Sequence, residues 1–294
     1  MRQTEERYIS LLTDFGFKRI FGSDINKYLL IDFLNSLFNG EQVVKNVTYL
    51  NSEHVGDVYA ERKAIFDVYC ENEHGEKFIV EMQNAYQTYF KDRSLYYATF
   101  PIREQAPKGD NWNFKLQHVY VVALLNNDMN EEAFSHESIN HDVGLLDKQT
   151  HKVFNNKLTF KYVEIARFNK DINELETNFD KWLYVLRNLS RLDNQPTYLR
   201  NEVFNRLFSQ AEIARFDKKE LKAYEDSLKA YRDIKNSLDT AKEEGRAEGH
   251  AEGASEKALA IARELLAMNM SIDNIKKVTG LTDDEIHNLS NTSL

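Results

Sequence analysis

The longest uninterrupted apolar run of this sequence covers residues 119–125 and reads Val-Tyr-Val-Val-Ala-Leu-Leu. A helix that crosses a membrane needs about 20 such residues, so the run is too short to span a bilayer. A short segment that is apolar on both of its faces is typical of the buried parallel strands of α/β proteins. The run therefore predicts a strand over residues 116–125 inside an α/β core, and it argues against a membrane protein.

Composition and charge narrow the class further. Hydrophobic residues make up 42% of the 294-residue chain, which is enough for a sizeable core. The single cysteine, Cys70, excludes an intramolecular disulfide and a zinc site of several thiolates, and this fits a reducing compartment. The opening residues, MRQTEERYIS, lack the apolar core of a secretory signal, so we expect a cytoplasmic protein. With a net charge of -9, DNA binding would need a local basic surface.

Helix and strand patterns alternate over the first 170 residues. Two short helices are expected within residues 8–38, and another helix over 92–105. The expected strands cover residues 43–50, 64–71, 77–83, 116–125 and 158–165. This alternation predicts one α/β domain over residues 1–170.

Helical patterns take over in the remainder of the chain. Residues 171–240 are expected to form a helical extension, with an apolar stripe from Leu221 to Leu238. Residues 241–294 begin with glycines at every fourth position, namely Gly245, Gly249 and Gly253. Each glycine costs a helix about 1 kcal/mol. This segment is therefore either a linker or a helix that a partner approaches closely, and the sequence leaves both open.

Residues 271–289 have the pattern of a helix–turn–helix, with a turn at Gly280. The expected core positions are Ile275, Val278, Ile286 and Leu289. A DNA-reading module of this shape carries a basic recognition helix. Here the second helix starts with Asp283, Asp284 and Glu285, which argues against contact with phosphate. We therefore expect a tail that binds a partner or a second copy, and a homo-oligomer that forms through the C-terminal helices.

The most informative segment is a predicted β-hairpin, with strands before and after the turn at residues 71–76. If residues 73–75 form a three-residue loop, Gly75 takes the left-handed position that such loops need. Asp67 then falls opposite Glu81, and opposed residues share a face of the hairpin. One face of the hairpin would then present Ile65, Asp67 and Tyr69 beside Ile79, Glu81 and Gln83. The other face, which would be the core face, would present Phe66, Val68 and Cys70 beside Phe78, Val80 and Met82.

Opposed carboxylates destabilise a strand pair unless something neutralises them. A divalent cation does so, and hard oxygen ligands suit Mg²⁺ or Mn²⁺. One carboxylate from each strand, a backbone carbonyl and waters are enough for a magnesium site, which can activate a water and stabilise charge on a phosphoryl group. Gln83 shares the face of Glu81 and could orient that water. From spacing alone, an exposed hairpin with surface acids is the simpler explanation of the pattern.

Several motifs resemble one known family. Asp67 together with Glu81-Met82-Gln83 is similar to the core of the PD-(D/E)XK nucleases. More closely, the chain resembles the Rpn family of recombination-promoting nucleases, which are also described as transposases. Residues 13–22 (Thr-Asp-Phe-Gly-Phe-Lys-Arg-Ile-Phe-Gly) look like that family's opening motif, and residues 93–97 resemble the helix after its hairpin. The glycine repeat and residues 275–286 are also typical of its C-terminus.

The resemblance implies a PD-(D/E)XK (restriction-endonuclease-like) core with a mostly helical C-terminal region. Asp67 and Glu81 would bind Mg²⁺, or Mn²⁺, together with the backbone carbonyl of Met82. Gln83 would stand where many related nucleases have lysine. The implied activity is a metal-dependent endonuclease that hydrolyses DNA phosphodiester bonds during recombination or mobile-element processing. The alternative is a catalytically weak member that binds DNA or proteins.

Four further residues are candidates for an accessory part in that site. Asp14 could be an additional acid near the metal or the N-cap of the first helix. Lys18 and Arg93 could contact phosphate or be ordinary surface charges. Lys63, four residues before Asp67, could supply the positive charge that Gln83 lacks, or be a solvated lysine at the start of a strand.

Overall fold

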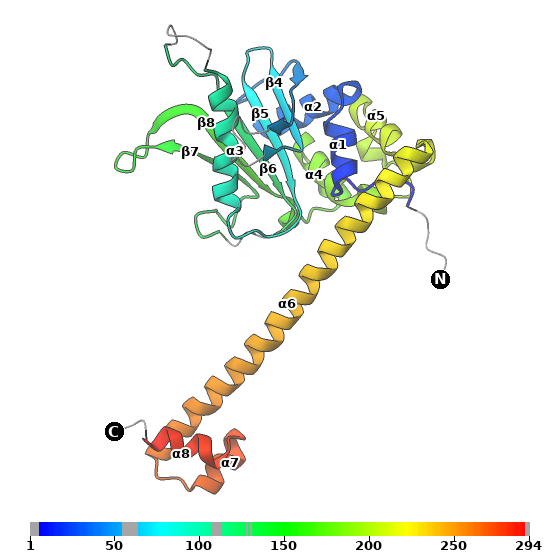
Figure 1. Cartoon of the computed structure of the whole chain (residues 1–294). Helices are drawn as coiled ribbons and strands as arrows, with labels where there is room; N and C mark the ends of the chain where they lie inside the picture. The colour runs from blue at the N-terminus through cyan, green and yellow to red at the C-terminus, as the bar shows by residue number, and fades with distance from the viewer. Residues whose placement is uncertain (1–5, 55–63, 107–112, 128, 130, 292–294) are drawn as a thin grey trace. The chain divides into compact units, whose positions relative to one another are not determined.

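The structure, a computed structural model, describes residues 6–54, 64–106, 113–127, 129 and 131–291. It has two compact units, Met1–Asp233 and Ile234–Leu294. The first unit is built around a six-stranded sheet, and the second unit is helical (Figure 1). The mixed α/β architecture with a helical C-terminal region confirms the fold class expected from the sequence.

The sheet has the strand order β1-β4-β5-β6-β8-β7. Its strands are β1 (Val47–Tyr49), β4 (Val68–Asn72), β5 (Lys77–Gln83), β6 (Val119–Leu125), β7 (Asn140–Leu146) and β8 (Val153–Glu164). β6 runs parallel to both β5 and β8, and the outer neighbours pair antiparallel. Every residue of β6 is buried, as its apolar sequence predicts. A separate two-stranded sheet joins β2 (Glu53–His54) and β3 (Ala64–Ile65).

Helices cover both faces of the large sheet, and residues along each strand alternate between them. On one face Val80, Val122 and Val163 pack against α1 (Asp14–Phe21), α2 (Lys27–Phe38), α4 (Asn178–Asn188) and α5 (Glu202–Ala211). On the other face Ile79, Val121 and Phe160 pack with residues of α3 (Phe90–Glu104). Figure 1 shows α3 alone on its side of the sheet. This arrangement leaves the ends of the strands as the places where polar chemistry can collect.

Residues after 170 contribute to the same core as the first helices. Trp182 of α4 is fully buried, and its ring lies 5.5 Å from that of Phe21, 5.7 Å from Phe33 and 5.1 Å from Phe204. α6 (Lys218–Ala267) starts in this unit, where the buried Tyr224 belongs to the core. The boundary between the two units falls after Asp233, within α6. The three-part division into residues 1–170, 171–240 and 241–294 stays a prediction.

Several strand predictions differ from the structure. The expected strand 64–71 is broken at Phe66 and Asp67 into β3 and β4, because the Asp67 side chain bonds to the backbone of β5. As a result Phe66 packs with Tyr69 and not on the face of Val68. The strand expected over 43–50 shortens to β1. The strand expected over 158–165 starts earlier, at Val153, because it pairs with β7, which was not predicted.

The second unit contains the rest of α6 with α7 (Ile272–Thr279) and α8 (Asp283–Asn291). Its small core consists of Ala262, Ile275, Leu281, Ile286 and Leu289. Val278 is 65% exposed, so the prediction that it is a core residue was wrong. The glycine repeat is helical and lies inside α6, which decides between the linker and the helix. Nothing in the described chain comes within 4 Å of a Cβ placed on Gly245, Gly249 or Gly253.

The described residues include no helix with both the length and the apolar character needed to cross a membrane.

The first turn of α1 depends on a glycine. Thr13 is the N-cap, and its hydroxyl accepts the N–H of Gly16 and donates to the carbonyl of Ser10. A Cβ on Gly16 would collide with that same carbonyl oxygen. Gly16 is therefore required where the chain folds back over the start of α1, the helix that carries Asp14 and Lys18.

We expect Gly16→Ala to lower the free energy of unfolding by about 1–3 kcal/mol, because the added methyl group meets fixed backbone. Urea unfolding followed by tryptophan fluorescence measures this loss. The matched variant is Gly249→Ala, where a Cβ has open space around it. Its higher helix propensity should make the helix about 1 kcal/mol more stable. Equal stability of Gly16→Ala and the native chain would contradict the close approach to Ser10.

Candidate active site

The β4–β5 hairpin has the register that its sequence predicts. Tyr69 pairs with Ile79 and Cys70 with Phe78. Gly75 has a φ of 74°, and its N–H donates to the carbonyl of Asn72 at 3.0 Å. The three-residue loop is therefore confirmed, and Asp67 lies just before β4 at the level of Glu81.

Asp67 and Glu81 are joined by reciprocal bonds between side chain and backbone. The N–H of Asp67 donates to Oε1 of Glu81 at 3.2 Å. The N–H of Met82 donates to Oδ2 of Asp67 at 2.9 Å. The Asp67 side chain is only 22% exposed. These bonds take the place of regular backbone pairing between Asp67 and Glu81 at the end of the hairpin. They hold the two carboxylates close together.

The surroundings favour the neutral form of both acids. Burial raises the pKa of the Asp67 carboxyl, although the Met82 N–H and the charge of Lys18 oppose that rise. Burial, and then the negative charge of Asp67, raise the pKa of Glu81 from 4.5 to about 8. Two carboxylates that share a poorly hydrated site cannot both ionise at low cost. Near neutral pH the pair in the ligand-free protein therefore retains a proton.

Lys18 of α1 reaches this pair from a distant part of the sequence. Its Nζ lies 2.7 Å from Oδ1 of Asp14 and 3.9 Å from Oδ1 of Asp67. Burial alone would lower the pKa of Lys18, but Asp14, Asp67 and Glu81 together hold it above its ordinary value. Asp14 is the first residue of α1 and not its N-cap, which is Thr13. Lys63, the other cation considered from the sequence, lies outside the described residues.

Gln83 ends β5 beside the same pair and is bound by an arginine. It is buried, its Oε1 accepts Nη2 of Arg93 at 2.6 Å, and its own amide donates to the carbonyl of Ala85. The guanidinium of Arg93 lies over the rings of Phe90 and Tyr97, at 5.0 and 5.6 Å from their centroids. The charge of Arg93 also acts on Asp67 and Glu81, so the structure brings together one network of Asp14, Lys18, Asp67, Glu81, Gln83 and Arg93.

A divalent metal ion suits this set of donors. Among the described residues no group of three or more His, Cys, Asp or Glu could hold a metal, so any site here rests on two carboxylates with peptide or water oxygens. Hard oxygen donors are the ligands of Mg²⁺ and Mn²⁺. Burial raises the pKa of both carboxyls, and the negative charge of Asp67 raises that of Glu81 further, so a bound cation would favour the ionised form of the pair.

Two asparagines that sequence reasoning missed support the network. The Asn84 amide donates to the carbonyl of Leu12 at 2.7 Å, and Asn126 donates to Asn84 at 3.2 Å. The backbone N–H of Asn126 also donates to the carbonyl of Gln83 at 2.8 Å. Both asparagines directly follow parallel strands. Their position at the carboxyl ends of β5 and β6 was a signal in the sequence that could have identified them.

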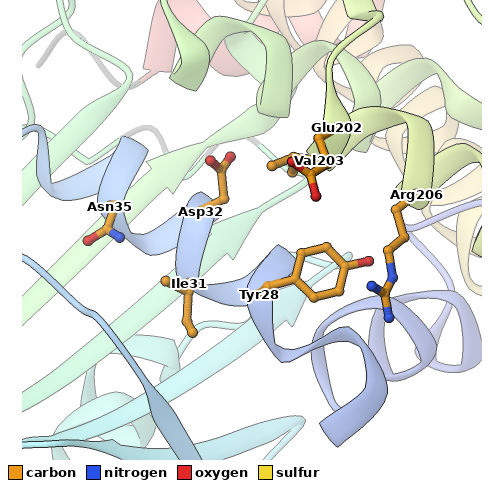
Figure 2. A pocket seen from close by; sticks show the side chains of 7 residues that line it. All are labelled: Tyr28, Ile31, Asp32, Asn35, Glu202, Val203 and Arg206. Carbon is orange, nitrogen blue, oxygen red and sulfur yellow. The ribbon is translucent and has the colours of Figure 1, made fainter.

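A hollow of about 380 Å³ lies elsewhere, between α2 and α5. Figure 2 shows Tyr28 and Asp32 of α2 facing Glu202 and Arg206 of α5. The Asp32 carboxylate already accepts hydrogen bonds from Asn178 at 2.8 Å and from the Trp182 indole at 2.7 Å. None of the network residues lines this hollow, so it is not part of the carboxylate site.

The family model described as PD-(D/E)XK nuclease family transposase matches residues 11–241. The chain belongs to this family. A second model, the C-terminal HTH domain of the Rpn/YhgA-like nuclease family, matches residues 255–291. Neither a curated protein nor a solved structure matches the chain.

These matches confirm the family expected from the sequence motifs. The match to PD-(D/E)XK nucleases covers the hairpin, the network and α1, and it ends inside α6. The HTH match covers α7 and α8, so this PD-(D/E)XK protein carries a module of a DNA-binding type despite the acidic start of α8. The expectation that the tail binds a partner instead stays a prediction.

The raised pKa of Glu81 predicts how stability depends on pH without metal. Folded Glu81 keeps its proton up to about pH 8, whereas the unfolded chain releases it near its ordinary pKa of 4.5. Because the folded state binds more protons in this range, the free energy of unfolding should fall as pH rises from about 5 to about 8.

Urea midpoints measured in EDTA at both pH values give this slope. Glu81→Gln keeps an acceptor for the Asp67 N–H but cannot ionise, so it should flatten the slope. The control, Glu71→Gln, changes an ion-paired acid on the same hairpin and should keep the native slope, because it leaves Asp67 and Glu81 in place. A slope in Glu81→Gln as steep as in the native chain would show that the acid pair does not cause it.

Proposed function

We propose that this protein is a Mg²⁺-dependent endodeoxyribonuclease that hydrolyses DNA phosphodiester bonds, with Mn²⁺ as a second usable ion. The observation that carries the proposal is the pair Asp67 and Glu81, held together at one end of the hairpin with raised pKa values. Membership of the PD-(D/E)XK nuclease family supports the same chemistry. The description of the family as a transposase family supports a context of mobile-element processing or DNA recombination. The cytoplasm, expected from the opening residues of the sequence, is the proposed location.

In this proposal Asp67, Glu81 and the Met82 carbonyl are the metal ligands. A bound Mg²⁺ supplies an activated water and stabilises charge on the phosphoryl group. The Gln83 amide is neutral and cannot act as a base, so its task is to orient the water. Arg93 fixes the orientation of Gln83 through the bond at 2.6 Å.

The positive charge that a lysine at position 83 would supply comes from elsewhere in this proposal. Lys18 remains charged because of Asp14, and its Nζ lies 3.9 Å from Asp67. A cation at this position can offset charge that develops on a phosphate bound beside the carboxylates. Asp14 then acts through Lys18 and not as a direct metal ligand.

The carboxylate pair gives the decisive test. Asp67→Ala and Glu81→Gln should each reduce Mg²⁺-dependent nicking of supercoiled plasmid by at least about 100-fold, because each removes an interaction that stabilises the transition state. Both variants should fold, since each relieves the repulsion between the two acids. Glu71→Gln on the same hairpin is the control and should nick like the native chain.

Native activity in excess EDTA, or full activity in Asp67→Ala, would contradict the proposed chemistry. A native chain that binds plasmid but never nicks it would instead support the alternative of a catalytically weak DNA- or protein-binding member. The match of residues 255–291 to an HTH domain makes DNA binding the more specific form of that alternative.

We further propose that the C-terminal helices assemble the protein into a homo-oligomer. Ile234 and Leu238 of α6 are 46% and 37% exposed, and the glycines that follow have open space around them in the described chain. An apolar helix face of this length needs a partner surface.

Truncation after Thr240 removes the glycine repeat and the HTH domain. Light scattering should give fewer chains per particle for the truncated protein than for the full chain. The truncated protein should also lose less nicking activity than Asp67→Ala does. If the truncated protein keeps the same number of chains per particle but loses DNA affinity in a gel shift, the tail acts as a DNA reader and not as an assembly element.

A further inference from the structure

Two exposed tyrosines follow Gln83 in the connection between β5 and α3. Tyr86 is 55% exposed and Tyr89 is 74% exposed. Within the described part of the chain, neither side chain has a hydrogen bond or a contact with another ring. Tyrosine is enriched at binding interfaces because its ring is apolar and its hydroxyl is polar, so these two rings, named here the tyrosine pair, are suited to contact a ligand.

The tyrosine pair lies next to the proposed site. Tyr86 is three residues from Gln83, so their Cα atoms are at most about 10 Å apart. Tyr89 caps the start of α3, and its carbonyl accepts the N–H of Arg93 at 2.9 Å. Arg93 in turn bonds Gln83 at 2.6 Å. A DNA strand with a phosphate at Asp67 and Glu81 would therefore place neighbouring bases within reach of the tyrosine pair.

The charges of the described residues around the site favour a ligand of low charge density. Lys18 is engaged by Asp14, Arg93 by Gln83, and Lys91 by Glu131 at 2.5 Å. The chain as a whole has a net charge of -9. Duplex DNA carries one charge per about 1.7 Å of axis, whereas a single strand carries one per about 3.4 Å. The acids of this site and the acidic chain as a whole therefore repel a single strand less than a duplex.

We infer that the tyrosine pair stacks on unpaired bases, so that the substrate of this site is single-stranded DNA or a single-stranded segment of a longer DNA. Aromatic rings stack on any base and give affinity without reading sequence. A duplex keeps its bases stacked inside and offers the tyrosine pair no such face. The inference rests on the proposed function, because it assumes that DNA occupies the Asp67–Glu81 site.

The test measures binding of the full chain to labelled oligothymidylate and to a duplex of equal length, in EDTA to prevent cleavage. Tyr86→Ala and Tyr89→Ala should each weaken binding of the single strand by roughly tenfold. Tyr86→Phe and Tyr89→Phe keep the ring and should bind within about twofold of the native chain. Because a duplex keeps its bases stacked inside and offers these rings no free base face, the duplex affinity should not change in any of these variants.

The matched control is Tyr198→Ala. Tyr198 is 58% exposed, similar to Tyr86, but lies in the short 3₁₀ helix Thr197–Leu199 between α4 and α5. Its loss should leave the affinity for oligothymidylate unchanged. The inference is overturned if the alanine variants of the tyrosine pair bind oligothymidylate like the native chain, or if the phenylalanine variants lose as much affinity as the alanine variants.

Plasmid nicking by the native chain in Mg²⁺ separates this inference from the proposed function. Nicking together with unchanged affinity in Tyr86→Ala and Tyr89→Ala would overturn the stacking and leave the nuclease proposal in place. Weakened single-strand binding in those variants, with no nicking by the native chain, would support the stacking and overturn the nuclease.

Discussion

Two carboxylates repel each other at a poorly hydrated place, and the β4–β5 hairpin holds them there. The restraint comes from the backbone, since the amides of Asp67 and Met82 each donate to the carboxylate of the opposite strand. The rest of the sheet keeps β5 from moving away, because all seven of its residues pair with β6. Buried Val80 and Ile79 fix the two faces of β5 against different layers of helices. The packing of the core therefore offsets the loss of stability that comes from burying the two acids side by side.

The cation beside this pair depends on a second set of contacts. Lys18 belongs to α1. The position of α1 depends on the segment just before it, around Ser10, and on the first turns of α6. The N–H of Ser10 donates to the hydroxyl of Tyr224 at 3.1 Å, and the N–H of Phe15 donates to Ser227 at 3.0 Å. Gly16 lets the chain approach the Ser10 carbonyl closely. The electrostatics of the hairpin thus depend on packing between opposite ends of the first unit.

Local signals in the sequence were sufficient for the hairpin. Gly75 and the loop length determine the register, and the register places Asp67 at the level of Glu81. The unbroken apolar pattern of β6 was likewise enough to predict a buried central strand.

Features that arise between distant segments could not be predicted in this way. The break at Phe66 and Asp67 results from a bond to β5. Strand β7 has no clean alternation, because its later residues, including Leu145 and Leu146, are exposed. The contact of Lys18 with Asp67 joins residues 49 positions apart in the printed sequence, and no spacing rule reaches that far.

The bonds from Ser10 and Phe15 to the first turns of α6 also determine where a different C-terminal tail could be joined to the first unit. The sheet and its acids end before residue 170, yet α1 is not fully supported until Tyr224 and Ser227 are in place. A gene fusion that joined the sheet to a new tail just after the last strand would leave Lys18 on a poorly anchored helix. A junction beyond Asp233, inside the continuous α6, would keep those contacts. A junction in α6 beyond Asp233 is therefore the place where a different tail could be attached without loss of the contacts that support α1.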